Sequence, residues 1–600
     1  MFYSSQKNQY KIISRRSALI LLGKVSLISV VGWKFFDIQI LKSKKYITLS
    51  KNNQISIKIL YPVRGEILDR NGKVIATNKK VYDLYIIPEQ SKNLNETLNN
   101  LNYFVNFSFK QKTKVIALSK KLKKFESIKV LENLDWKNLE LIETNKNHLS
   151  GLSLQEDYQR IYPDNDYFSH ILGYISQPSQ KDLSLPYISK MPRLDIGKTG
   201  LEKFLDEKLI GKAGKKEVEV NAFGKIIREI SSTPSTEGQK ISISIDSRLQ
   251  KFLYNELKIH KAGSVVVLDI NTGEIISMVS NPSYNPNLII QKPNIDYWES
   301  ITKNSLSPLT NRSVQGLYSP GSTFKMIVAL AALKYNLINH NDHFTCKGKI
   351  EFGDRLYHCW KTKGHGRINL ENAIVQSCDV YFYELSKKIG IEKIAELAEE
   401  FGLGKKYNIG LDNEKEGIVP SKKWKKENLQ ESWYAGETLN TAIGQGYALS
   451  TPLQLAVMTA RIASNGKKVE PTLFKNFLKK EFTQMKDIPK HLDIIKKAMF
   501  RVVNDQTGTA SKNKSNKFLF SGKTGTSQVK KITVSERESD DFRKKEVEWK
   551  NKDHALFVGY MPSDKPKYAI SVIIEHGGSG ASTAAPIAKN VFNYIYDLKI

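Results

Sequence analysis

The sequence predicts an α+β multidomain protein with an N-terminal membrane-spanning helix, a mixed external domain, and a C-terminal domain whose antiparallel sheet has helices on both sides. The first observation is length, because 600 residues exceed what one hydrophobic core usually organises. The second is an apolar run near the start that is long enough to cross a bilayer. The third is a series of apolar strand-like runs, mixed with helical patterns, in the second half. A hydrophobic content of 40% suffices for packed cores.

The N-terminal segment predicts a single membrane span. Residues 1–16 form a polar, basic tail, and residues 17–36 are mainly apolar, so about twenty residues cover roughly 30 Å of hydrocarbon. Basic residues before the span place the N-terminus in the cytoplasm and the rest outside. A cleaved signal peptide is the alternative, and it is disfavoured because no small-x-small cleavage site follows the apolar run.

The first external domain is expected at 37–235. Apolar alternation on both sides of Asn71-Gly72 predicts a tight β-hairpin there. Residues 91–147 are lysine-rich and loosely helical, which suits a projecting subdomain. The turn-rich sequence SSTPSTEGQ at 231–239 predicts a linker, and it marks the boundary with a second domain at 236–600.

The second domain should contain an antiparallel sheet between helices. After an amphipathic helix near 247–257, two apolar strands flank the turn at 271–273. Two further strand-like runs, HALFVGYMP and YAISVIIEH, lie near the C-terminus, and residues 585–598 have the pattern of a closing helix.

The segment YSPGSTFKMIVALAAL, residues 318–333, contains the candidate nucleophile Ser322. The apolar run after it predicts a buried helix, and Lys325, one helical turn from Ser322, is the polar exception. An ammonium among apolar side chains should lose its proton more easily than in water, so Lys325 is the candidate base. The backbone N–H of Ser322 would help to bind an oxyanion. The pattern S-x-x-K alone is weak, because it also occurs at Ser300, Ser464, Ser511 and Ser527.

Two later motifs strengthen this assignment: Ser377-Cys378-Asp379 and Lys523-Thr524-Gly525-Thr526. The ordered set S-x-x-K, S-x-D and K-T-G resembles the penicillin-recognising serine acyltransferases. The sequence R-G-x-I-x-D-R-N-G, beginning at Arg64, resembles the non-catalytic pedestal, or dimerisation-type, domain of class B penicillin-binding proteins. This resemblance implies a bacterial inner-membrane peptidoglycan D,D-transpeptidase with a periplasmic catalytic domain. It would cross-link stem peptides through a Ser322 acyl-enzyme and would be acylated by β-lactams.

The resemblance also implies roles for the remaining site residues. Ser377 would relay a proton, and Asp379 would hold the network with Lys325. Lys523 with Thr524, Gly525 and Thr526 would bind the substrate, and the Thr526 N–H would complete the oxyanion hole. Many relatives have asparagine where this chain has Asp379. An ionised Asp379 beside Lys325 works against a neutral lysine, so the proton assignment of this coupled pair stays open.

All three cysteines fall in one window with a histidine, in the pattern C-x12-C-x5-H-x12-C. Three thiolates and an imidazole complete the shell of a structural zinc site, so one Zn²⁺ is predicted on Cys346, Cys359, His365 and Cys378. The resemblance to this family, some members of which carry a metal site here, adds weight to that prediction. A disulfide with one free thiol and three inert buried thiols are the alternatives. His358 is an alternative to His365, whose glycine neighbours let the backbone approach a metal.

The sequence Tyr357-His358-Cys359-Trp360, together with G-H-G and S-C-D, resembles the elongation-type enzyme more than the septal one. The resemblance implies a SEDS-type, RodA-like membrane glycosyltransferase and the elongation machinery as partners. The segment Gly444-Gln445-Gly446-Tyr447 also matches the family and is interpreted as scaffold. The alternatives are a septal transpeptidase, a β-lactam sensor and a hydrolase of the same fold. No nucleic-acid partner is expected, because the net charge of +31 is spread along the chain without a nucleic-acid motif.

Overall fold

The computed structural model describes residues 3–44, 55–122, 124, 127–189, 191, 194–221, 226–290, 294–475, 481–530 and 548–598. Two compact units interleave along the chain. The smaller contains Met1–Pro62, Lys80–Gln159 and Lys212–Glu237, and the larger contains Val63–Lys79, Arg160–Gly211 and Gly238–Ile600. Most of the charged segment after the K-T-G motif, 531–547, lies outside the described residues.

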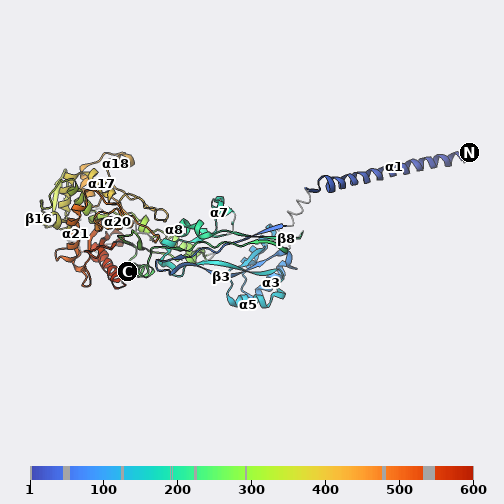
Figure 1. Ribbon diagram of the computed structural model, residues 1–600, viewed down its shortest axis with the longest axis horizontal. Helices are drawn as coiled ribbons and strands as arrows, with labels where there is room; N and C mark the ends of the chain where they lie inside the picture. The colour runs from blue at the N-terminus through green and yellow to red at the C-terminus, as the bar shows by residue number, and fades with distance from the viewer. Residues whose placement is uncertain are drawn as a thin grey trace. The chain divides into compact units, whose positions relative to one another are not determined.

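The N-terminal helix α1 spans Tyr3–Phe36, and a π-helical turn at Asp37–Leu41 follows it. The stretch Arg15–Leu41 is long and apolar enough to cross a membrane, and none of its apolar window is buried within the protein. The predicted apolar helix is therefore present, and its helical conformation begins before residue 17 (Figure 1).

The smaller unit contains the three-stranded sheet β1 (Ile55–Leu60), β8 (Gly214–Val220) and β9 (Ile226–Thr233). It also contains the predicted helical subdomain, with α3 (Leu94–Phe104), α4 (Phe109–Lys121), α5 (Trp136–Thr144) and strand β4 (Ile128–Leu131). Side-chain caps from Asn93, Ser108 and Asp135 start the three helices. Strand β9 includes residues 231–233, so the first part of the predicted linker is paired strand.

The larger unit begins with the predicted hairpin. Strand β2 (Ile67–Leu68) pairs antiparallel with β3 (Val74–Ile86) and parallel with β10 (Ile241–Ser242). Gly72 has φ +84°, and the Asp69 carboxylate accepts the backbone N–H groups of Asn71 and Lys73, which explains the tight turn. The hairpin prediction is confirmed.

The central sheet has the order β12 (Ile275–Asn281), β11 (Gly263–Asp269), β19 (Tyr568–Ile574), β18 (His554–Met561) and β17 (Ser521–Ser527), with every pair antiparallel. Alternate side chains of the strands enter two separate cores. On one face, Val265 and Val267 pack with α10 (Ser247–Lys258) and α23 (Ala585–Leu598).

On the other face, Val266 and Leu268 share a core with α14 (Lys325–Lys334) and α20 (Pro452–Ala463). Helices α17 (Ile391–Glu400), α18 (Lys422–Leu429) and α21 (Pro489–Asn504) also belong to this unit (Figure 1). The predicted antiparallel sheet with helices on both sides is confirmed. Every residue of α14 from Lys325 to Leu333 is buried, as the apolar run predicts.

Candidate active site and cysteine cluster

The candidate nucleophile lies on a tight turn that other segments hold in place. Ser322 is half-buried in a 3-10 turn, Gly321–Thr323, and α14 begins only at Lys325. Gly321 has φ +54°, and a Cβ there would lie 2.7 Å from the carbonyl oxygen of Thr526. The backbone N–H of Gly321 donates to Gly444 O at 2.9 Å. The turn is therefore packed against strand β17, and Ser322 lies just before the buried helix, as the sequence predicts.

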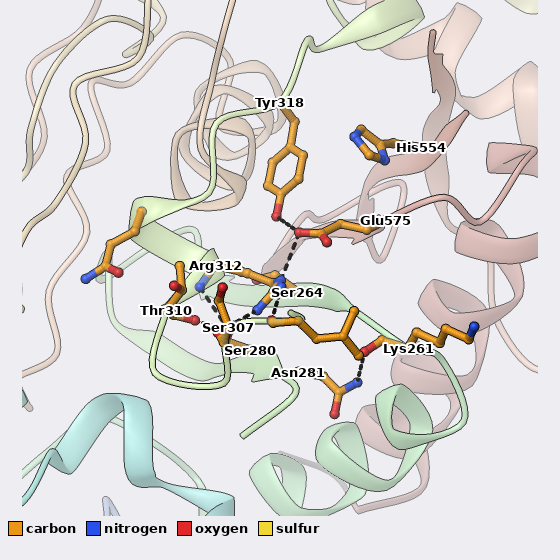
Figure 2. A network of polar contacts seen from close by, with 12 residues as sticks. Lys261, Ser264, Ser280, Asn281, Ser307, Thr310, Arg312, Tyr318, His554 and Glu575 are labelled. Atoms are coloured by element: carbon orange, nitrogen blue, oxygen red, sulfur yellow. Dashed lines mark hydrogen bonds and ion pairs between the residues drawn. The ribbon is translucent and has the colours of Figure 1, made fainter. Parts of the chain in front are cut away.

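Figure 2 shows a polar network that includes Tyr318, which precedes the nucleophile turn in the sequence. The Tyr318 hydroxyl donates to the Glu575 carboxylate at 2.7 Å, and Arg312 Nε donates to the same carboxylate oxygen at 2.8 Å. Burial, together with the charge of Glu575, raises the pKa of Tyr318 well above its usual value, so the phenol remains a donor. The His554 ring lies edge-on to Tyr318 at 5.6 Å, and burial lowers the pKa of His554 to about 4. His554 is therefore neutral at pH 7.

Four predicted catalytic side chains meet beside the turn. Lys325 Nζ donates to Asp379 Oδ1 at 2.7 Å and to Ser377 Oγ at 3.3 Å. Lys523 Nζ, from β17, donates to the same Ser377 Oγ at 3.0 Å. The Ser377 hydroxyl thus connects the two lysines. Among the described residues, Lys325 makes no hydrogen bond to Ser322, so in this resting arrangement its partners are Ser377 and Asp379.

The two lysines have different electrostatic surroundings. Lys325 forms an ion pair with the part-buried Asp379, and its Nζ lies 5.5 Å from the centre of the Phe382 ring in a cation–π contact. Burial lowers the pKa of Lys523 well below its usual value; the positive charge of Lys325 lowers it further, and Asp379 opposes the shift. The buried setting of Lys523 therefore favours its neutral amine form, a role that sequence reasoning does not assign to it.

The S-C-D loop has a strained backbone that Trp360 helps to hold. Ser377 has φ +54°, which is unfavourable for a residue with a side chain. Its carbonyl oxygen accepts hydrogen bonds from Lys325 Nζ at 2.9 Å and from Trp360 Nε1 at 3.1 Å. The backbone N–H of Trp360 donates to Asp379 Oδ2 at 2.9 Å. Trp360 was part of a family signature in the sequence, but its contacts with the loop were not predicted.

Strand β17, which contains K-T-G-T, forms one edge of the central sheet. The Thr524 and Thr509 hydroxyls are 2.8 Å apart. Gly525 allows β17 to approach the nucleophile turn, because a Cβ there would lie 3.2 Å from Pro320 O. Thr526 is the exposed residue of this strand, and its carbonyl oxygen accepts from Gln445 Nε2 at 3.3 Å. No sequence pattern indicates the Thr509 contact, and sequence reasoning interprets the Gln445 segment as scaffold.

The three cysteines and His365 form one cluster. Cys346 ends β13 (His343–Cys346), Cys359 follows β15 (Arg355–His358), His365 precedes β16 (Gly366–Asn369), and Cys378 caps α16 (Asp379–Ile389). The four donor atoms all lie within 4.8 Å of one another. All three thiols are free and buried. The structure brings His365, and not His358, to these thiols.

The spacing of these donors fits a tetrahedral zinc ion. The sulfurs of Cys346 and Cys359 each lie 3.6 Å from His365 Nδ1. Zinc bonds of about 2.3 Å to sulfur and about 2.0 Å to nitrogen, at a tetrahedral angle, require an S···N separation of about 3.5 Å. His365 Nε2 is buried and has no hydrogen-bond partner among the described residues, so Nδ1 is the nitrogen directed at the thiols. These two sulfur–nitrogen distances are therefore compatible with a tetrahedral metal site.

Comparisons with known proteins agree across the whole chain. The family described as the penicillin binding protein transpeptidase domain matches residues 263–593, and the penicillin-binding protein dimerisation domain matches residues 59–243. The peptidoglycan D,D-transpeptidase MrdA of Haemophilus influenzae is 32% identical, with 100% of this chain and 94% of that protein covered. The protein of the same name from Acinetobacter baumannii is 33% identical, with 98% of this chain and 88% of that protein covered.

Solved structures give the same result. The complex between penicillin-binding protein PBP2 and MreC from Helicobacter pylori matches with a TM-score of 0.81 and 32% identity, covering 91% of this chain and 99% of that chain. Pseudomonas aeruginosa PBP2 in complex with WCK 5153 matches with a TM-score of 0.66 and 30% identity, covering 90% of this chain and 96% of that chain.

Proposed function

We propose, on the premise that this chain belongs to the transpeptidase family of penicillin-binding proteins and is an elongation-type peptidoglycan D,D-transpeptidase, that Ser322 is its acyl-accepting nucleophile. The observation that carries this proposal is the convergence of two lysines, Ser377 and Asp379 beside the Ser322 turn, at distances of 2.7 to 3.3 Å. A cluster with two buried lysine side chains joined by one hydroxyl is suited to moving protons during acyl transfer.

In the acylation step, Ser322 Oγ attacks the carbonyl carbon of the terminal D-Ala-D-Ala peptide bond. As Lys325 receives the Ser322 proton, it passes one of its own protons through Ser377 Oγ to Lys523. The net change is one proton moved from Ser322 to the Lys523 amine, whose pKa is lowered by burial. Collapse of the tetrahedral intermediate breaks the C–N bond, and the same route returns the proton to the departing D-alanine amine.

The oxyanion of that intermediate would be bound by the backbone N–H groups of Ser322 and Thr526. Thr524, Gly525 and Thr526 would bind the C-terminal carboxylate and the extended stem peptide along the free edge of β17. An amine from a second stem peptide then attacks the ester, which regenerates Ser322 and forms the cross-link. A β-lactam forms the same ester but leaves no free amine to depart.

We also propose that Cys346, Cys359, His365 and Cys378 hold one structural zinc ion. The 3.6 Å sulfur–nitrogen distances support this assignment. With four protein donors the ion has no open coordination position, so it supplies a cross-link rather than a Lewis acid. That link would join the segment after α14 to the S-C-D loop.

The membrane position and the partners are part of the proposal. Helix α1 would anchor the enzyme in the inner membrane with its basic tail in the cytoplasm and its transpeptidase domain, 236–600, in the periplasm. Residues 37–235 would form the pedestal. One similar solved structure is a complex with MreC, and another, at 27% identity, is a peptidoglycan synthase complex. This chain would therefore act in an elongation assembly with a SEDS-type membrane glycosyltransferase.

Intact-mass measurement of the full-length protein with penicillin tests the nucleophile. We expect one adduct on the native chain and none on Ser322→Ala, because the ester cannot form without the hydroxyl. Ser300→Ala is a matched control, since Ser300 also begins an S-x-x-K sequence but lies in the surface helix α12 (Ile295–Thr302). An adduct on Ser322→Ala would overturn the assignment. Rapid release of hydrolysed penicillin would favour a hydrolase, and binding without formation of stem-peptide dimers would favour a sensor.

A further inference from the structure

The G-Q-G-Y segment contacts both sides of the reacting centre. It follows α19 (Ala435–Ala442), and the Gly444 carbonyl oxygen accepts the Gly321 N–H of the nucleophile turn at 2.9 Å. The next residue, Gln445, is anchored by its backbone N–H, which donates to Asn440 O at 3.0 Å. Its side-chain amide reaches β17, where Nε2 donates to Thr526 O at 3.3 Å. Two consecutive residues, Gly444 and Gln445, therefore connect the nucleophile turn with the strand proposed to bind substrate.

The carbonyl oxygen that Gln445 contacts is one that an added peptide strand needs. Strand β17 has a neighbour on one side only, and groups on its other edge are available to an extended peptide. Thr526 O faces the nucleophile turn, because a Cβ on Gly321 would lie 2.7 Å from it and Gln445 Nε2 donates to it. The Gln445 amide N–H thus occupies the position at which a peptide N–H of a bound substrate would donate.

The S-C-D loop does not supply an amide donor from residue 379. Both oxygens of the Asp379 carboxylate accept hydrogen bonds, one from Lys325 Nζ and the other from the Trp360 N–H. Asp379 therefore offers no hydrogen-bond donor to a substrate carbonyl group beside the nucleophile. Gln445 has a side-chain NH₂ group within hydrogen-bonding distance of the proposed substrate strand, and an amide side chain can rotate to a new acceptor at small energetic expense.

We propose that Gln445 is a specificity-determining residue that recognises the amide bond preceding the scissile bond of the donor peptide. When the donor adds to β17, its N–H replaces Gln445 Nε2 at Thr526 O, and the released Nε2 donates to the carbonyl oxygen of that same amide. The exchange conserves the number of hydrogen bonds only for ligands that carry this amide. The inference rests on the proposed function, because it takes Ser322 as nucleophile and β17 as the substrate edge.

Two β-lactams separate recognition of this amide from general reactivity. Benzylpenicillin carries an acylamido side chain with an N–H and a carbonyl group, and 6-aminopenicillanic acid carries a bare amine at the same position. The second-order acylation rate of the full-length protein is measured with each. We expect Gln445→Ala to slow benzylpenicillin about five- to tenfold, the effect of roughly one neutral hydrogen bond, and to change 6-aminopenicillanic acid by less than about twofold.

Gln484→Ala is the matched control, because Gln484 also donates from Nε2 to a backbone carbonyl, Asn465 O, at an exposed site. It should leave both rates unchanged. Gln445→Glu keeps the length of the side chain but has no N–H to donate, so it should give the same selective loss and serves if the alanine variant is unstable.

An equal loss with both β-lactams, or no loss with either, would refute the recognition role and leave Gln445 as scaffold. Failure of the proposed function has a different signature. It would appear as acylation of Ser322→Ala by both compounds, whatever the rate ratio measured for the Gln445 variants.

Discussion

Replacing Cys346 with serine removes one donor of the cysteine cluster without changing any side chain of the lysine–serine network. Cys346 is 2% exposed and lies at the end of β13, where it pairs with Gly366 of β16. A metal at a free concentration of about 1,000 times its dissociation constant stabilises the folded state by about 4 kcal/mol. For a unit of roughly 350 residues the unfolding entropy is about 0.7 kcal/mol/K, so Cys346→Ser should lower the unfolding temperature by about 6 °C.

The same substitution should slow acylation, because the two remaining cysteines adjoin residues of the active site in the sequence. Cys378 lies between Ser377 and Asp379, and Cys359 precedes Trp360, whose N–H holds Asp379 at 2.9 Å. Loss of the metal would free both Cys378 and Cys359, so both of these segments could shift. A displacement of a reacting group by about 1 Å can slow a reaction by about 100-fold, so we expect a large fall in penicillin acylation with Ser322 still present.

The assay combines elemental analysis, thermal unfolding and the penicillin acylation rate. His358→Asn is the control, because His358 adjoins Cys359 but is not among the four clustered donors. It should retain about one zinc per chain, whereas Cys346→Ser should retain almost none. Metal-free native protein with full activity would refute the reasoning, and so would a disulfide between any two of the three cysteines.

Three further outcomes are expected. Asp379→Asn should destabilise the protein by about 3 to 5 kcal/mol and nearly abolish acylation, because it leaves the buried Lys325 side chain without its ion-pair partner. Denaturant unfolding measures the stability and penicillin labelling measures the acylation. A variant that is as stable and as active as the native protein would contradict this prediction. The lowered pKa of Lys523 means that the unfolded chain binds more protons between the folded and unfolded pKa values, so stability should rise with pH in that window. Lys523→Met should remove that rise. If the stabilities of the native protein and the variant changed in parallel with pH, the proposed contribution of Lys523 would be refuted. Tyr318→Phe should slow acylation about tenfold by removing the hydrogen bond to Glu575, and an unchanged rate would show that the ring alone holds the turn.

Much of the fold follows from local patterns. Asn71-Gly72 forms the predicted turn because the glycine adopts a positive φ. The K-T-G-T sequence lies on β17, the strand at one edge of the central sheet. The cysteine spacing predicted one cluster, and the protein brings those four residues together. These features depend on residue type and order, which a sequence displays directly.

Other features depend on tertiary contacts that no local pattern contains. The packing of the Ser322 turn against Thr526, far along the chain, is one such contact, and it occurs at Gly321. The neutral lysine cannot be chosen from spacing, since the choice depends on the burial of Lys523 and on the 2.7 Å ion pair of Lys325. Gln445 likewise meets Thr526 across 81 positions of sequence.

The order of strands in the central sheet has a consequence for the timing of synthesis. Strand β19, made close to the end of the chain, lies between β11 and β18 in the middle of the sheet, and Glu575 follows it directly. A growing polypeptide therefore carries Ser322, the proposed nucleophile, long before the residues that complete the sheet have left the ribosome. Premature termination before β19 would leave a chain that has this serine but lacks the middle strand of the central sheet.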